Sequence, residues 1–148
     1  MYSSRHHGNT EKIARTMASA LNAQLVNLKE ADTPALADYD LIGFGSGIYW
    51  GKHDRRILDL VDNLPLQNNK KAFVFSTSGL NEGRVLNNFN KRLKRKLREK
   101  GFTIIGDFSC RGFDTLGPLI LIGGIHKGRP NENDLEAAAD FAKGLQAK

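Results

Sequence analysis

Two short apolar segments constrain the fold of this chain more than any other feature of its sequence. These segments are residues 41–45 and residues 71–75. Apart from Lys71 they are apolar, and polar side chains do not alternate with apolar ones in either of them. Strands without such alternation are buried on both faces, as the strands of a parallel sheet are. The sequence therefore predicts a parallel sheet that is covered on both sides.

Helical periodicity elsewhere in the sequence predicts the helices that cover this sheet. Apolar residues recur at helical spacing over residues 10–21, 54–64, 85–100 and 133–145. Asn9 and Thr10 both have side chains that cap helix N-termini. The side chains expected to face the core are Ile13, Met17, Ala20, Leu21, Ile57, Leu58, Val61, Leu64, Phe89, Leu93, Leu97, Leu135, Ala138, Ala139 and Ala142.

Further strands are expected over residues 24–28 and over residues 102–105, with an extension to Cys110. Strands and helices then alternate along the chain, which predicts an α/β fold with one domain over residues 1–148. In such sheets ligands bind beyond the carboxyl ends of the strands. Candidate site residues are therefore sought in the segments that follow the strands.

Composition excludes several classes of protein. Hydrophobic residues make up 40% and charged residues 26%, which excludes a wholly disordered chain and a disulfide scaffold. The one cysteine, Cys110, cannot form an internal disulfide and is expected to pack at a strand end rather than act as a nucleophile. The longest apolar run, residues 119–122, is far shorter than a membrane helix. A cytoplasmic location is the resulting expectation.

The first candidate segment runs directly into a predicted helix. A helix N-terminus presents free N–H groups, so hydroxyls, a glycine and a cation beside it make an anion site. The alternative is a polar loop with an N-cap, and two adjacent histidines without further ligands do not favour zinc. The candidate residues are Ser3, Ser4, Arg5, His6, His7, Gly8, Asn9 and Thr10.

The second candidate segment, residues 45–52, places two large aromatic side chains between glycines. It lacks residues that the phosphate-binding Walker A and dinucleotide motifs require. The aromatic side chains suit a planar ring, on which Trp50 or Tyr49 can stack; the alternative is that they pack under the next helix. The candidate residues are Ser46, Gly47, Ile48, Tyr49, Trp50 and Gly51.

The third candidate segment follows the second buried strand. Its hydroxyls and free N–H groups suit the polar edge of a heterocycle, although a polar turn is the alternative. The candidate residues are Ser76, Thr77, Ser78 and Gly79. The sequence contains no evident Ser–His–Asp or Cys–His arrangement.

Taken together, the three segments resemble those of the flavodoxin family. Residues 3–10 resemble the family's phosphate loop, (S/T)-x-T-G-N-T, although His7 replaces a hydroxyl residue and the loop is one residue longer. Residues 45–51 and 76–79 resemble its two flavin loops, and residues 110–115 with 128–130 resemble one branch of flavodoxin-like proteins. The resemblance implies the strand order 2-1-3-4-5, with FMN phosphate in the first loop and the isoalloxazine between the other two.

The resemblance implies an FMN-binding electron-transfer protein that acts with a redox partner protein. One alternative is an FMN-dependent reductase of quinones or similar small acceptors on the same fold. Another is a non-redox binding module that uses the basic helix at residues 91–100.

The sequence departs from the family at its start. The family has about five apolar residues before the phosphate loop, whereas here only Met1 and Tyr2 precede Ser3. Five buried apolar side chains contribute on the order of 8–15 kcal/mol, comparable to the net stability of a domain. We therefore expect the first strand to be truncated at Met1 and the coding region to begin upstream, with a rearranged sheet as the alternative.

The net charge of +6 is confined to one predicted helix. From Lys91 to Lys100 there are seven basic residues and one acidic residue, so the remaining chain is balanced. This is opposite to electron-carrier flavodoxins, which are typically acidic. A solvated helix face is one interpretation and a docking site for an acidic redox partner is another; the lack of interleaved aromatic residues disfavours nucleic acid.

Overall fold

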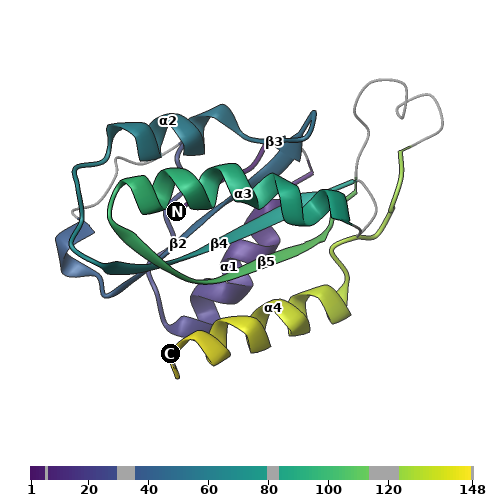
Figure 1. Ribbon diagram of the computed structural model, residues 1–148. Coiled ribbons are helices and arrows are strands. Elements are labelled where there is room, and N and C mark those ends of the chain that lie inside the picture. The colour runs from purple at the N-terminus through teal and green to yellow at the C-terminus, as the bar shows by residue number, and fades with distance from the viewer. Residues whose placement is uncertain (6, 30–35, 80–83, 114–123, 148) are drawn as a thin grey trace.

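The computed structural model describes residues 1–5, 7–29, 36–79, 84–113 and 124–147. A parallel sheet lies between two helical layers, with α1 and α4 on one face and α2 and α3 on the other (Figure 1). The elements are β1 (Tyr2–Ser3), α1 (Asn9–Leu21), η1 (Leu36–Asp38), β2 (Leu41–Tyr49), β3 (Lys52–His53), α2 (Arg55–Asn63), β4 (Lys70–Ser78), α3 (Arg84–Glu99), β5 (Phe102–Arg111) and α4 (Glu132–Leu145).

The strands β1, β2, β4 and β5 are parallel neighbours in that order, and β3 pairs antiparallel with β2 as a short hairpin. The strand expected over residues 24–28 is reduced to one parallel bridge between Asn27 and Tyr2. This bridge still places the segment on the outer side of β1. The predicted order of strand segments is therefore confirmed, although the second of them is not a full strand.

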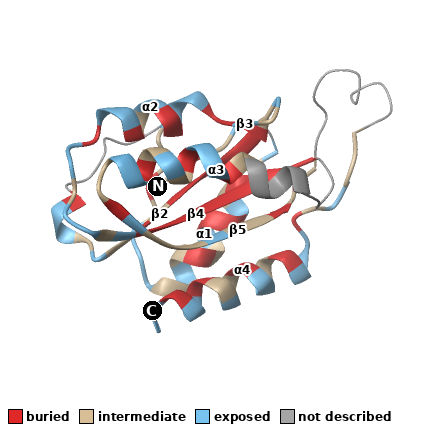
Figure 2. Cartoon of the chain, in the orientation of Figure 1, coloured by how far each residue is buried: buried red, intermediate tan, exposed pale blue. Residues whose placement is uncertain are grey.

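The buried faces of the helices meet the sheet as the periodicity predicts (Figure 2). On the α2–α3 side, Leu93 and Leu97 are fully buried, and all four predicted side chains of the α2 region lie in the same core cluster. On the opposite side, Ile13 and Met17 pack with Ala138 and the buried Cys110, whose predicted packing role is confirmed. Leu135 and Leu21 are only partly buried against this cluster.

The first strand is short rather than absent. Tyr2 and Ser3 pair with Gly45 and Ser46, and the Met1 amine donates a hydrogen bond to the Gly43 carbonyl at 2.8 Å. Burial lowers the pKa of this amine to about 5. Beside it lies an apolar groove that is lined by α1, residues 23–26, the start of β2 and two β4 rings, including Met17, Leu21, Val26, Ile42, Phe73 and Phe75.

Two segments that the sequence analysis treats as loops are largely strand. β2 continues to Tyr49 and β4 continues to Ser78, so most of the predicted loop residues hydrogen-bond within the sheet. The glycines of β2 explain the error, because they leave space for aromatic rings rather than form turns. A Cβ at Gly45 would overlap the Phe75 ring, and one at Gly47 would overlap the Tyr49 side chain.

Within the described ranges, no helix has both the length and the apolar character needed to cross a membrane.

Candidate functional site

The connection between β1 and α1 leaves the start of the helix without a side-chain cap. The N-cap is Gly8, in the left-handed conformation at φ 65°, so the prediction that Asn9 or Thr10 caps the helix is wrong. Asn9 instead donates its amide to the Phe113 carbonyl at 2.7 Å, and the hydroxyl of Thr10 bonds that of Thr77 at 2.8 Å. The N–H groups of the first turn are therefore available to an anion.

Polar groups around this helix start differ in their exposure. Ser3 is fully buried, and its hydroxyl has no hydrogen-bond partner among the described residues. Ser4 is half-buried, and the exposed His7 packs on the Phe113 ring with 4.4 Å between ring centroids. His6 lies outside the described residues.

Arg5, a predicted cation of this segment, has its charge balanced by an acidic partner. Its guanidinium forms an ion pair with the buried carboxylate of Asp54 and lies 5.6 Å from the centroid of the Tyr49 ring. Burial favours neutral Asp54, but hydrogen bonds from Arg5 and from the Arg56 amide outweigh it and lower the pKa of Asp54. Arg5 thus joins the first segment to the second, and its charge is already compensated.

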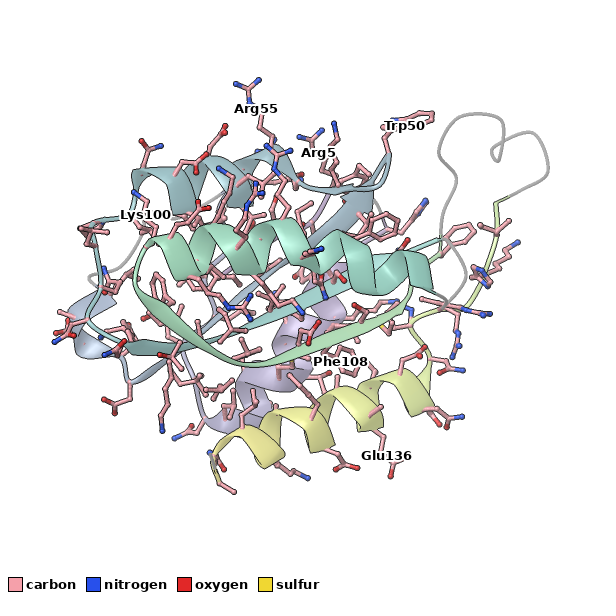
Figure 3. The ribbon with its side chains drawn as sticks, viewed as in Figure 1. Arg5, Trp50, Arg55, Lys100, Phe108 and Glu136 are labelled. Atoms are coloured by element: carbon pink, nitrogen blue, oxygen red, sulfur yellow. The ribbon has the colours of Figure 1, made fainter. Side chains whose placement is uncertain are left out.

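The β2–β3 hairpin presents the single tryptophan at its tip. Trp50 and Gly51 form the turn with φ 51° and 75°, and the Trp50 side chain is 82% exposed. Figure 3 shows the indole extending away from the body of the molecule. Tyr49 is half-buried, whereas Gly47 and Ile48 are buried in β2. Trp50 therefore presents an exposed aromatic surface, and the alternative that it packs under the next helix is wrong.

The third predicted segment is buried at the end of β4. Ser76, Thr77 and Ser78 are strand residues, and Gly79 follows them in a bend. The Thr77 hydroxyl is bonded to Thr10, so this strand end contacts the start of α1. The first and third segments therefore meet at these two residues.

The strand ends also form a row of serines that the sequence analysis missed. The sheet register aligns one serine from each of the four parallel strands, and aligned residues face the same side of the sheet. These are Ser3, Ser46, Ser76 and Ser109. The hydroxyls of Ser76 and Ser109 bond each other at 2.8 Å.

Two further buried residues, His53 and Asn90, complete this polar layer. The Ser46 hydroxyl lies 2.8 Å from His53 Nδ1, and His53 Nε2 lies 2.9 Å from Asn90 Oδ1. The sequence signal that could have found the layer is the recurrence of a serine near the end of each predicted strand. Because their hydroxyls are bonded within this layer and their backbones pair within the sheet, Ser46 and Ser76 have little left to offer a cofactor.

The site therefore has three parts at one edge of the sheet. The uncapped start of α1 can bind an anion, Trp50 can stack on a planar ring, and the backbone just beyond β2 and β4 can hydrogen-bond a polar ring edge. These parts match in kind what phosphate and isoalloxazine groups require, and the unpartnered Ser3 hydroxyl and the open space around Gly8 agree with such a fit.

Comparison with known proteins agrees with this architecture. The family profile described as flavodoxin domain matches residues 1–112. An uncharacterized protein of Methanocaldococcus jannaschii is 47% identical over 145 residues, covering 98% of this chain and 95% of the relative.

Solved structures share the fold at low identity. Flavodoxin 1 from Bacillus cereus has a TM-score of 0.71 at 19% identity, with 99% of this chain and 95% of that chain covered. Rubredoxin oxygen oxidoreductase from Desulfovibrio gigas has a TM-score of 0.69 at 17% identity, with 99% of this chain but only 35% of that chain covered. On the match of its sequence to the domain profile, the chain belongs to the flavodoxin family.

Proposed function

We propose that this protein binds FMN at the carboxyl edge of its sheet and transfers electrons to or from a partner protein. The observation that carries the proposal is the arrangement of an uncapped helix start and an exposed indole on neighbouring strand ends. Bound FMN supplies the electron chemistry, and the protein supplies binding, orientation and electrostatics.

The proposed roles of the residues follow from their surroundings. The N–H groups after Gly8, with Ser4 and Thr10 beside them, hold the phosphate. Trp50 stacks on the isoalloxazine, and the backbones of the hairpin and of residues 76–79 meet its polar edge. Arg5 supports the site through Asp54 rather than through direct neutralisation of the phosphate.

The ion pairs of the basic helix limit which of its cations can contact an acidic partner. Lys94 and Lys96 form ion pairs with Asp107 and Asp62 and are mostly buried, so they belong to the fold. The exposed cations of α3 that pair with no described acid are Lys91, Arg92 and Arg98. We propose these three as the docking cations.

An absorbance spectrum of the purified protein tests the proposal. Flavin bands, present at once or after addition of FMN and desalting, are expected; a protein that stays colourless contradicts it. Two separated one-electron steps in a reductive titration support a carrier. Rapid NAD(P)H oxidation without a partner protein supports instead the reductase of small acceptors.

A further inference from the structure

Arg5 contacts the β2–β3 hairpin at Tyr49 and pairs with Asp54, which directly follows β3. β3 has only two residues and pairs only with β2, through Ile48 with His53 and Tyr49 with Lys52. Helix α3 also supports the hairpin: Asn90 contacts His53, and the ring of Phe89 lies close to Gly51. The position of the hairpin tip therefore depends on its contacts with this helix.

The hydrogen bonds of His53 run in one direction through the polar layer. Asp54 donates its backbone N–H to Ser46 Oγ at 3.0 Å, and the Ser46 hydroxyl is within 2.8 Å of His53 Nδ1. Because Asn90 Oδ1 can only accept, His53 carries its proton on Nε2, and its Nδ1 accepts from Ser46. That hydroxyl also lies 2.9 Å from the Gly47 carbonyl, which competes for its single proton.

The direction continues across the sheet. Asn90 Nδ2 donates to Ser109 Oγ at 3.0 Å, and Ser109 bonds Ser76. His53, Asn90, Ser46 and Ser76 are all at least nine-tenths buried, so none of these bonds is readily replaced by bonds to water. Removal of the imidazole leaves Asn90 Oδ1 without its donor, whereas the Ser46 hydroxyl can donate to the Gly47 carbonyl instead.

We propose that His53 is a positioning residue that holds the β2–β3 hairpin, and with it Trp50, at the cofactor-binding edge of the sheet. The effect of His53 on cofactor binding rests on the proposed function. Its effect on the mobility of the hairpin can be measured in the protein without cofactor. Burial lowers the pKa of His53 to about 4, which keeps the imidazole neutral at pH 7.

The first test uses the full chain without FMN. Two variants are compared: His53→Phe removes both polar contacts, and His53→Gln retains an amide that can reach Asn90. Leu97→Ala, a buried change about two turns further along α3, controls for general loss of stability. Amide exchange over residues 48–53 and fluorescence anisotropy of Trp50, the only tryptophan, report on the hairpin directly.

The rate of amide hydrogen exchange in the hairpin is compared with that of the β4 amides in the same protein. This ratio is expected to rise about tenfold in His53→Phe, less in His53→Gln, and not at all in Leu97→Ala. Trp50 anisotropy is expected to fall in the same order. If His53→Phe does not fold, His53→Gln decides. The proposal is overturned if the folded His53 variant shows the same amide exchange in the hairpin and the same Trp50 anisotropy as Leu97→Ala.

The second test measures the midpoint potentials and the dissociation constant of bound FMN. Both are expected to change in the His53 variants and to stay at wild-type values in Leu97→Ala. Unchanged potentials and affinity in FMN-binding His53 variants also overturn the proposal. Failure of the wild-type protein to bind FMN contradicts the proposed function instead, and the hairpin measurements still decide whether His53 holds Trp50.

Discussion

His53 Nε2 lies 2.9 Å from the side-chain oxygen of Asn90, and this contact joins the hairpin that carries Trp50 to helix α3. The imidazole has a pKa of about 4 in the folded protein against 6.5 for an unperturbed histidine, because it is buried. The unfolded chain therefore binds a proton at His53 across a window of pH in which the folded chain does not. Stability must fall as the pH is lowered through this window.

The predicted loss between pH 6.5 and pH 4 is about 3 kcal/mol in the free energy of unfolding. Urea unfolding at several pH values measures it. In His53→Gln this part of the pH dependence is expected to be absent, although the variant is less stable at pH 7. The same acid-induced loss in both proteins contradicts the assignment to His53.

The ion pair between Arg5 and Asp54 predicts a second stability effect. Arg5→Met leaves the Asp54 carboxylate buried without its partner, and we expect a loss of about 1–3 kcal/mol at pH 7. Arg15→Met is the matched control, because Arg15 pairs with Glu11 on the helix surface and the expected loss is below about 1 kcal/mol. Equal losses in the two variants would show that the buried pair has no special role.

The same pair predicts a shift in acid stability. The folded pKa of Asp54 is lowered, so its contribution is present above the unfolded value of about 3.8 and is lost as the pH falls through the folded pKa. In Arg5→Met the pKa of Asp54 is expected to rise toward or above the unfolded value, so this acid-induced loss of stability shrinks or disappears. NMR titration of the Asp54 carboxyl carbon checks this; an unchanged pKa contradicts it.

The groove beside Met1 predicts that an apolar extension stabilises the fold. Five apolar residues fused before Met1 can pair along the start of β2 and fill the groove, at roughly 1.5–3 kcal/mol for each fully buried side chain. An extension of five Gly and Ser residues is the control, because it also moves the amine but offers no apolar side chains. Thermal unfolding compares them, and equal midpoints contradict the expectation.

The buried amine itself adds a pH effect. Its pKa of about 5, against 8.0 for an ordinary N-terminus, makes the free energy of unfolding fall as the pH is lowered from 8 to 5. Both extended proteins are expected to lose this part of the pH dependence. Its persistence in either of them shows that the Met1 amine is not the titrating group.

Removal of the Trp50 indole is expected to weaken FMN binding about tenfold or more, in keeping with stacking energies of roughly 1–3 kcal/mol. Leu66→Ala is the control, because Leu66 is the other large apolar residue that is highly exposed, at 79%, in the described part of the chain. Fluorescence titration of FMN measures both affinities. Unchanged affinity in Trp50→Ala shows that another group contacts the ring.

Much of the fold could be predicted because burial alone determines it. The apolar periodicity of α2 and α3 identifies Ile57, Val61, Leu93 and Leu97 as core residues, and all four are buried. The ends of β2 and β4 could not be predicted in this way. Their glycines and serines are typical of loops, whereas in the structure they accommodate rings from β4 or bond in a buried polar layer.

The sequence indicates the three segments of the proposed site but not the contacts that support them. Nothing in the sequence around Arg5 indicates a partner at Asp54, and nothing around His53 indicates Asn90, because each pair is separated by more than 30 residues. The cap of α1 was predicted wrongly because Asn9 and Thr10 bond to distant groups, Phe113 and Thr77. Such contacts depend on tertiary packing, which local patterns do not contain.

The measurement that tests the central claim most directly is a titration of the protein with FMN while Trp50 fluorescence is recorded. Because Trp50 is the only tryptophan and lies at the proposed ring site, saturable quenching at one FMN per chain is predicted, with a shifted flavin absorbance. The claim would be contradicted if, after mixing, Trp50 emission stayed that of the protein alone and the absorbance stayed that of free FMN.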